Sequence, residues 1–256
     1  MEVLKPVIDI ARQAGVAIME VYASSDAGTT FKENNSPLTL ADTRAHFLIL
    51  KALKNLTPDL PVLSEESADV PYEIRKTWKK YWLVDPLDGT KEFLKKNGEF
   101  TVNIALIENG EPVLGVVHAP AKNRTYYAEK GKGAFSMNGD NKAVAIHVDR
   151  EAKAGLKVVI SRSHLDKETE EFLKKLGPHE SVTVGSSLKF CLVAEGTAHA
   201  YPRFWPSMEW DTAAAQCVVE EAGGTVRDLT AKNLTYNKQN LKNPFFIAGV
   251  SAALKK

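Results

Sequence analysis

The apolar positions near the start of the chain recur at helical spacing. They fall at intervals of three and four in residues 7–21, and the same spacing returns in residues 47–53, which predicts two amphipathic helices. Four short apolar runs follow, and we expect each to form a strand: residues 61–64, 81–84, 101–107 and 112–118. Because a polar turn at residues 108–111 joins the last two, the pattern favours a mostly antiparallel meander.

The pattern changes near Asp149, where strands and helices begin to alternate. The expected elements are strands at 157–160 and 182–184 and helices at 168–176 and 188–194. Such alternation is typical of α/β folds. The fold class is therefore α/β in the broad sense, with α+β and α/β parts, and we expect two fused sub-domains at residues 1–148 and 149–256.

Composition excludes some classes of function. The 256 residues carry a net charge of +1, with 33 Lys and Arg against 32 Asp and Glu and no basic block, so binding to a nucleic-acid polymer is not expected. Cys191 and Cys217 lie in apolar helical contexts and are predicted to be buried thiols in a reducing compartment. No transmembrane segment is expected, because no apolar run approaches about 20 residues. The expected location is the cytoplasm; peripheral contact with the inner membrane, and a monomeric or homodimeric state, stay open.

The most informative motif is Asp-Pro-Leu-Asp-Gly-Thr at residues 85–90. Leu83 and Val84 finish the expected strand, Pro86 restricts the backbone between the two acids, and an amphipathic segment starts at Lys91. Amides at the start of a helix bind anions, and carboxylates bind hard cations. Together these are the two parts that metal-assisted hydrolysis of a phosphate ester requires.

Three further acidic motifs have alternative interpretations. Glu65 and Glu66 form either a solvated turn or a metal site, in which Glu65 binds the ion and Glu66 accepts a hydrogen bond from a nearby water. Asp211 starts a strong helical pattern and is either a plain N-cap or a capped carboxylate that also binds metal. Thr39 and Asp42 have the spacing of a capping box, and on these residues alone the cap is the better interpretation.

Residues 63–66, 85–90 and 210–224 resemble, in order and separation, the three signatures of the inositol monophosphatase superfamily of lithium-sensitive, magnesium-dependent phosphatases. Within it the chain looks most like the CysQ-type 3'(2'),5'-bisphosphate nucleotidases. The runs that carry this closer resemblance are residues 81–93, 97–103, 160–164, 185–196 and 201–204. The resemblance covers nearly the whole chain and implies a layered αβαβα sandwich.

The resemblance also implies a site for two or three Mg²⁺ ions. Glu65, Asp85 and the carbonyl of Leu87 would hold one ion, and Asp85, Asp88 and Asp211 would hold a second. All of these ligands except Asp85 would also contact the substrate.

Catalytic roles follow from the same resemblance. Gly89 and Thr90 would meet the phosphate through backbone amides. Asp42 and the Thr90 hydroxyl would orient and deprotonate the attacking water, with Glu66 as an additional acceptor. This assigns a catalytic role to Asp42 in place of the simple cap.

Substrate choice is expected in the second half of the chain. Ser161 follows the strand at 157–160, and open α/β sheets bind ligands at the carboxyl ends of their strands. The resemblance implies a pocket for the nucleoside and a second phosphate, with Arg162 and Arg203 as less certain cations. The implied pocket residues are Ser161, His164, Ser187, Lys189 and Arg203. Each also has an ordinary structural interpretation, such as a strand end or a solvated charge.

The implied reaction is removal of the 3'-phosphate from adenosine 3',5'-bisphosphate, a by-product of sulfate activation, to give AMP and phosphate. One alternative is a phosphatase of inositol or sugar phosphates. It is disfavoured because Phe204, Trp205 and Pro206 stand where inositol phosphatases usually carry an acidic group. The other alternative, a catalytically silent nucleotide sensor, is disfavoured because every expected metal carboxylate is present.

Overall fold

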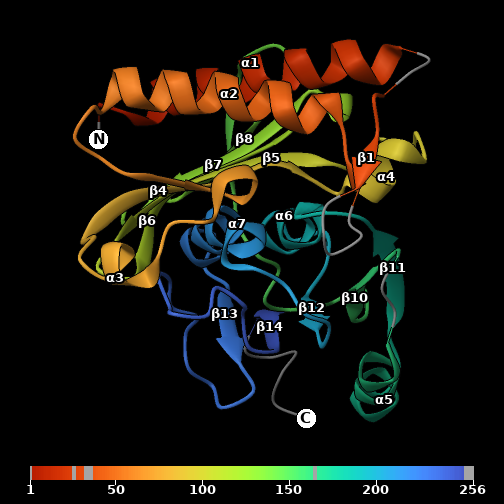
Figure 1. The fold of residues 1–256 in the computed structure, drawn as a ribbon. Helices are drawn as coiled ribbons and strands as arrows, with labels where there is room; N and C mark the ends of the chain where they lie inside the picture. The colour runs from red at the N-terminus through yellow and green to blue at the C-terminus, as the bar shows by residue number, and fades with distance from the viewer. Residues whose placement is uncertain (1, 25–26, 32–36, 164–165, 251–256) are drawn as a thin grey trace.

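Helices and sheets alternate in five layers through the molecule (Figure 1). The structure is a computed structural model that describes residues 2–24, 27–31, 37–163 and 166–250. Helices α1 (Leu4–Ala23) and α2 (Leu40–Leu56) cover one face of the larger sheet. Helices α6 (Leu188–Ala194) and α7 (Glu209–Glu221) lie between the two sheets, and α5 (Lys167–Leu176) lies beyond the smaller one. The predicted αβαβα sandwich is confirmed.

The larger sheet has seven strands in chain order. They are β3 (Val62–Ser64), β4 (Lys80–Asp88), β5 (Thr101–Glu108), β6 (Glu111–Ala119), β7 (Arg124–Glu129), β8 (Ala134–Met137) and β9 (Ala143–Ile146). Only the β3–β4 pair is parallel, so the predicted antiparallel meander is confirmed. The last three strands were not predicted, because the glycines and asparagines between them suggested a polar break rather than tight turns.

The smaller sheet has five strands in the order β11-β10-β12-β14-β13. They are β10 (Lys157–Ser161), β11 (Glu180–Val184), β12 (Ala200–Arg203), β13 (Thr225–Asp228) and β14 (Phe246–Gly249). Strand β10 runs parallel to β11 and β12, whereas β14 runs antiparallel to β12 and β13. The predicted alternation of strands and helices therefore describes only the start of this half. Short elements complete the fold: β1 (Thr30–Phe31), β2 (Pro37–Leu38), α3 (Tyr72–Arg75), α4 (Thr90–Leu94) and the 3₁₀ turns Glu65–Ser67 and Pro120–Lys122.

Strand β4 does not end at Val84 as predicted but continues to Asp88. Its neighbour β3 pairs with it only as far as Val84, so the missing N–H group of Pro86 costs no hydrogen bond to β3. The pairing with β5 is irregular between Asp85 and Asp88, and such a bulge re-aims side chains. Gly89 then adopts φ +94° and starts α4, which a residue without a Cβ does at little cost.

Helix α7 packs unusually close to the larger sheet. A Cβ on Gly115 of β6 would lie 2.2 Å from the carbonyl oxygen of Ala214, so only glycine allows this contact. One hydrophobic core joins both sheets across this layer and includes Cys191 and Cys217, which are buried and unpaired as predicted. Among the described residues, no helix has both the length and the apolar character needed to cross a bilayer.

Candidate active site

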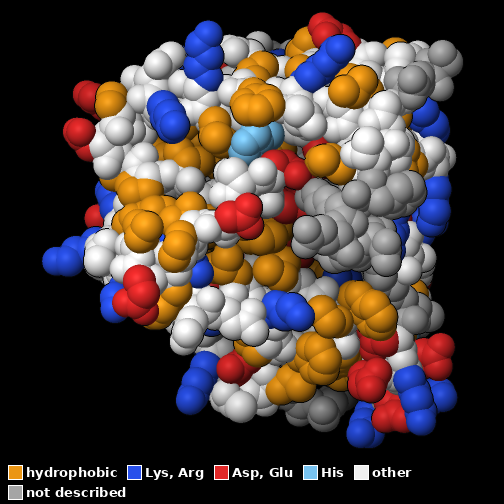
Figure 2. Space-filling model, in the orientation of Figure 1, with side chains coloured by type: hydrophobic (Ala, Val, Ile, Leu, Met, Phe, Trp, Pro, Cys, Tyr) orange, Lys and Arg blue, Asp and Glu red, His pale blue; other side chains and the backbone are white. Residues whose placement is uncertain are grey.

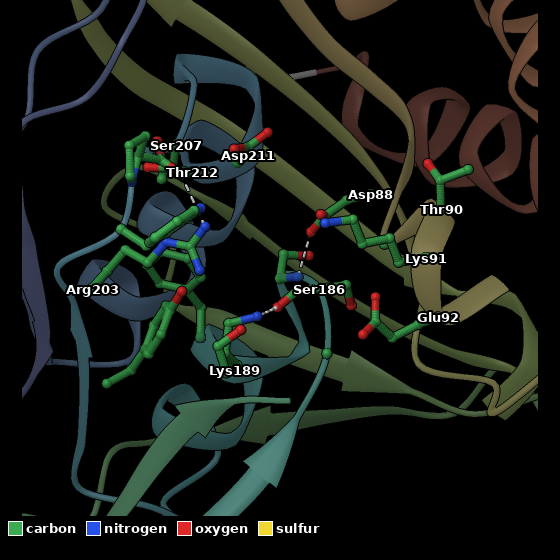
Figure 3. A pocket seen from close by; sticks show the side chains of 18 of the residues that line it. Asp88, Thr90, Lys91, Glu92, Ser186, Lys189, Arg203, Ser207, Asp211 and Thr212 are labelled. Atoms are coloured by element: carbon green, nitrogen blue, oxygen red, sulfur yellow. Dashed lines mark hydrogen bonds between the residues drawn. The ribbon is translucent and has the colours of Figure 1, made fainter. Parts of the chain in front are cut away.

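A cavity of about 280 Å³ lies between the end of β4 and the smaller sheet. Most of the predicted site residues line it: Glu65, Asp88, Gly89, Thr90, Ser161, Ser187, Lys189, Arg203 and Asp211 (Figure 3). Figure 2 shows acidic side chains in the middle of this face, between α2 and the layer of α6 and α7. The fold therefore brings together motifs that are more than a hundred residues apart in the sequence.

Three aspartates form a crowded group of like charge. Burial, together with the charges of Glu65, Asp88 and Asp211, raises the pKa of Asp85 well above its usual value. Burial also raises the pKa of Asp88. For Asp211, burial and the charges of Asp88 and Glu65 raise the pKa to about 8. Carboxylates in this situation repel each other unless a proton or a cation lies among them.

The chemistry of these side chains fits a hard cation, since every candidate donor is an oxygen. Within the described residues, however, no three acidic, histidine or cysteine side chains converge closely enough to enclose an ion. The like charges that raise the pKa values of Asp85 and Asp211 are nonetheless of the kind that a divalent cation neutralises. The residues present therefore fit a divalent metal.

Backbone amides hold two of these carboxylates in place. The Leu87 amide donates to Asp85 Oδ1 at 3.0 Å, and the Met208 amide donates to Asp211 Oδ2 at 2.8 Å. The cap of α7 is Met208, so the interpretation of Asp211 as a plain N-cap is wrong. Instead, Asp211 lies one turn into the helix and reaches back to its start.

Asp42 caps α2 and also contacts Thr90. Its Oδ2 accepts hydrogen bonds from the amide and hydroxyl of Thr39, at 2.8 and 2.6 Å, which confirms the capping box. Its Oδ1 lies 3.4 Å from the hydroxyl of Thr90, which also lies 3.4 Å from the carbonyl of Leu87. Burial raises the pKa of Asp42 to about 6 despite the Thr39 hydrogen bonds, and the charge of Glu66 adds to the rise. Glu66 itself is half-buried and does not line the cavity.

Two cationic side chains also line the cavity, and their charges oppose the rise in the pKa of Asp88 (Figure 3). Lys189 is buried, its Nζ donates to the carbonyl of Ser186 at 2.5 Å, and burial lowers its pKa to about 8. Arg203 donates to the carbonyl of Pro206 at 3.1 Å. Its Nε is buried and has no hydrogen-bond partner within the described part of the chain.

Other predicted residues are placed differently. Ser187 lies at the cavity wall, but its hydroxyl contacts Asn103 and Thr101, each at 2.7 Å, rather than pointing to a ligand. Arg162 does not line the cavity, because its guanidinium pairs with Glu99. His164 lies outside the described residues.

Several residues of the cavity wall were not predicted from the sequence: Lys91, Glu92, Ser186, Tyr201 and Phe246. Lys91 and Glu92 could have been found, since they directly follow the motif at residues 85–90. Phe246 carries no local signal, because only the pairing of β14 with β12 brings it to the site.

The sequence profile of the inositol monophosphatase family matches residues 1–244, and the chain belongs to this family. Within the family, the 3'(2'),5'-bisphosphate nucleotidases CysQ of Salmonella typhimurium and Escherichia coli are each 52% identical to it, over 95% of this chain and 98% of theirs. The crystal structure of CysQ from Bacteroides thetaiotaomicron superposes with a TM-score of 0.87, at 43% identity over 96% of both chains. The IMPase of Thermotoga maritima superposes with a TM-score of 0.81, at 29% identity over 98% of this chain and 93% of that one. The predicted family is confirmed.

Replacing Asp211 by Asn removes one charge from the crowded carboxylates but keeps an oxygen for the Met208 amide. In the presence of a chelator, we expect Asp211→Asn to unfold at a higher temperature than the wild type, by about 2–4 °C for each kcal/mol of relieved repulsion. Asp166→Asn is the matched control, because Asp166 accepts the Thr169 amide at the start of α5. Calorimetry measures both variants, and equal midpoints would contradict the proposed repulsion.

Proposed function

We propose that this chain removes the 3'-phosphate of adenosine 3',5'-bisphosphate to give AMP and phosphate. The observation that carries the proposal is a cavity lined by carboxylates, by the start of α4 and by two cationic side chains, in a chain that is 52% identical to the CysQ nucleotidases. A substrate with two phosphates suits such a cavity, since one phosphate can react while the other is held by Lys189 and Arg203.

We infer that Mg²⁺ is the cofactor, with two or three ions per site. Glu65, Asp85, Asp88, Asp211 and the carbonyl of Leu87 would hold it, whereas zinc would favour nitrogen and sulfur ligands. When bound, Mg²⁺ would polarise the phosphate and stabilise charge on the attacking and leaving oxygens.

The side chains of the chain itself would then orient the phosphate and move a proton. The amides of Gly89 and Thr90, at the start of α4, would donate to the phosphate oxygens. A water beside the Thr90 hydroxyl would pass a proton to it, and Thr90 would pass its own to Asp42 Oδ1, 3.4 Å away. A pKa of about 6 suits Asp42 as a base near neutral pH. Glu66 would accept a further hydrogen bond from water.

The remaining cavity wall suits a nucleoside better than a polyol. Tyr201, Trp205 and Phe246 contribute aromatic surface, which can pack against a base. In this proposal Ser161 lies near the nucleoside, and Ser187 acts through Asp88, to which its amide donates at 2.5 Å. The inositol phosphatase alternative predicts acidic groups for sugar hydroxyls in this region, where Phe204, Trp205 and Pro206 stand.

Substrate identity is tested by phosphate release from adenosine 3',5'-bisphosphate beside inositol 1-phosphate, with Mg²⁺ present or removed by chelation and dialysis. We expect Mg²⁺-dependent turnover of the nucleotide, little turnover of inositol 1-phosphate, and inhibition by Li⁺. Faster hydrolysis of inositol 1-phosphate would favour the alternative function. Activity that survives chelation would exclude the proposed cofactor.

The proton path is tested at Thr90. Thr90→Ala keeps the backbone amide but loses the hydroxyl, so we expect kcat to fall by about 10²–10⁴-fold with little change in KM. Thr90→Ser, which keeps the hydroxyl, should retain most of the activity. A loss confined to KM, or an equal loss in both variants, would contradict a role in proton transfer.

The second phosphate is tested at Lys189. Losing one charged hydrogen bond costs about 1.5–3 kcal/mol, so Lys189→Met should lower kcat/KM for adenosine 3',5'-bisphosphate by about 10- to 100-fold. Adenosine 3'-monophosphate, which has only the scissile phosphate, is the internal control and should be nearly unaffected. Equal losses on both substrates would mean that Lys189 supports the structure and does not bind the second phosphate.

A further inference from the structure

Glu99, just before β5, connects the larger sheet to the ends of two strands of the smaller one. Its carboxylate accepts two hydrogen bonds from Arg162, at 2.6 and 2.7 Å, and one from the amide of Gly185, at 2.8 Å. Arg162 directly follows β10 and also donates to the carbonyl of Thr183 in β11 at 2.9 Å. Burial tends to raise the pKa of Glu99, but the hydrogen bonds from Arg162 and Gly185 outweigh it and the pKa is lowered. The carboxylate is therefore charged at neutral pH.

The backbone of Glu99 is also packed against two glycines of the active site. A Cβ on Gly89 would lie 2.9 Å from the carbonyl oxygen of Glu99, and a Cβ on Gly185 would lie 3.0 Å from the same atom. The Cβ of Ser186 would lie only 3.2 Å from a Cβ on Gly89. The phosphate-binding turn before α4 and the turn at residues 185–187 thus meet at Glu99.

The turn at residues 185–187 makes hydrogen bonds to two side chains of the cavity wall, Asp88 and Lys189. Ser186 has φ +51°, an uncommon conformation for a residue other than glycine. Beside it, the Ser187 amide donates to Asp88 Oδ2 at 2.5 Å, and the Ser186 carbonyl accepts from Lys189 Nζ at 2.5 Å (Figure 3). A backbone in such a conformation persists only where its surroundings hold it.

We propose that Glu99 is a positioning residue that holds the turn at residues 185–187 against the start of α4 and so orients Asp88 and Lys189. The proposal rests on the proposed function for the roles of those two side chains. Glu99 does not line the cavity; it acts through the Gly185 amide. Its loss should therefore change Mg²⁺ binding and turnover more than it changes folding.

The test compares Glu99→Ala with Glu195→Ala. Glu195 is a matched control, because it also joins the two halves of the chain: it pairs with Arg124 at 2.7 Å, and it accepts a hydrogen bond from Tyr126. The two carboxylates are similarly buried, with 13% of the Glu99 side chain and 11% of the Glu195 side chain exposed. Neither Glu195 nor its partners line the cavity.

We expect Glu99→Ala to lower kcat/KM, and to weaken Mg²⁺ binding in a calorimetric titration, by about 10- to 100-fold. Glu195→Ala should leave kcat/KM and Mg²⁺ binding unchanged, although its melting temperature should fall by about as much as that of Glu99→Ala. Glu99→Gln keeps an oxygen for the Gly185 amide, so it should recover part of the loss. If Glu99→Ala does not fold, weakened Mg²⁺ binding in Glu99→Gln supports the proposal.

The proposal would be overturned if every Glu99 variant that folds bound Mg²⁺ as tightly as Glu195→Ala does. The calorimetric titration needs no substrate, so it is independent of the proposed reaction. A wild-type protein that does not hydrolyse adenosine 3',5'-bisphosphate would contradict the proposed function, while the Mg²⁺ titration would still decide the role of Glu99.

Discussion

Mutual repulsion among buried carboxylates is the constraint on which the arrangement of this molecule depends. Asp85 and Asp88 lie on β4 and Asp211 lies on α7, and each has a raised pKa because burial removes the water that would otherwise stabilise its charge. Folding must hold them together against this repulsion. Backbone amides do so directly, since each of the three accepts a hydrogen bond from an amide.

Rigid secondary structure is needed to hold these three carboxylates in place. The close contact of α7 with β6 at Gly115 fixes the helix that carries Asp211. The same helix belongs to the core that joins both sheets, so Asp211 cannot move away from β4 without disturbing that core. Placing charged groups on regular elements rather than on loops keeps their geometry constant, which catalysis by oriented groups requires.

Local patterns predicted most of the elements and the motifs of the site, but not the contacts between distant parts of the chain. The capping box of Asp42 is visible in four consecutive residues, whereas its contact with Thr90 spans 48 positions. A carboxylate has two oxygens, so the cap and the contact with Thr90 use different atoms. Strand β4 runs through Pro86 because its neighbour β3 ends first, which no local rule shows. Glu99 and Ser187 likewise gain their partners only when the two sheets meet.

The buried thiol of Cys217 can report on motion of α7 relative to the larger sheet. Cys217 lies on the face of α7 that approaches Gly115, and its sulfur is 3.9 Å from the carbonyl oxygen of Ala128 in β7. Cys217 is 1% exposed, although it borders a cavity beside Glu111 and Glu220, so we expect a thiol reagent to react with it fully only when the packing of α7 against the larger sheet loosens. The rate of its labelling in the folded protein therefore measures the free energy of that local opening. Because the same helix carries Asp211, the separation that exposes the sulfur would also take the active site apart.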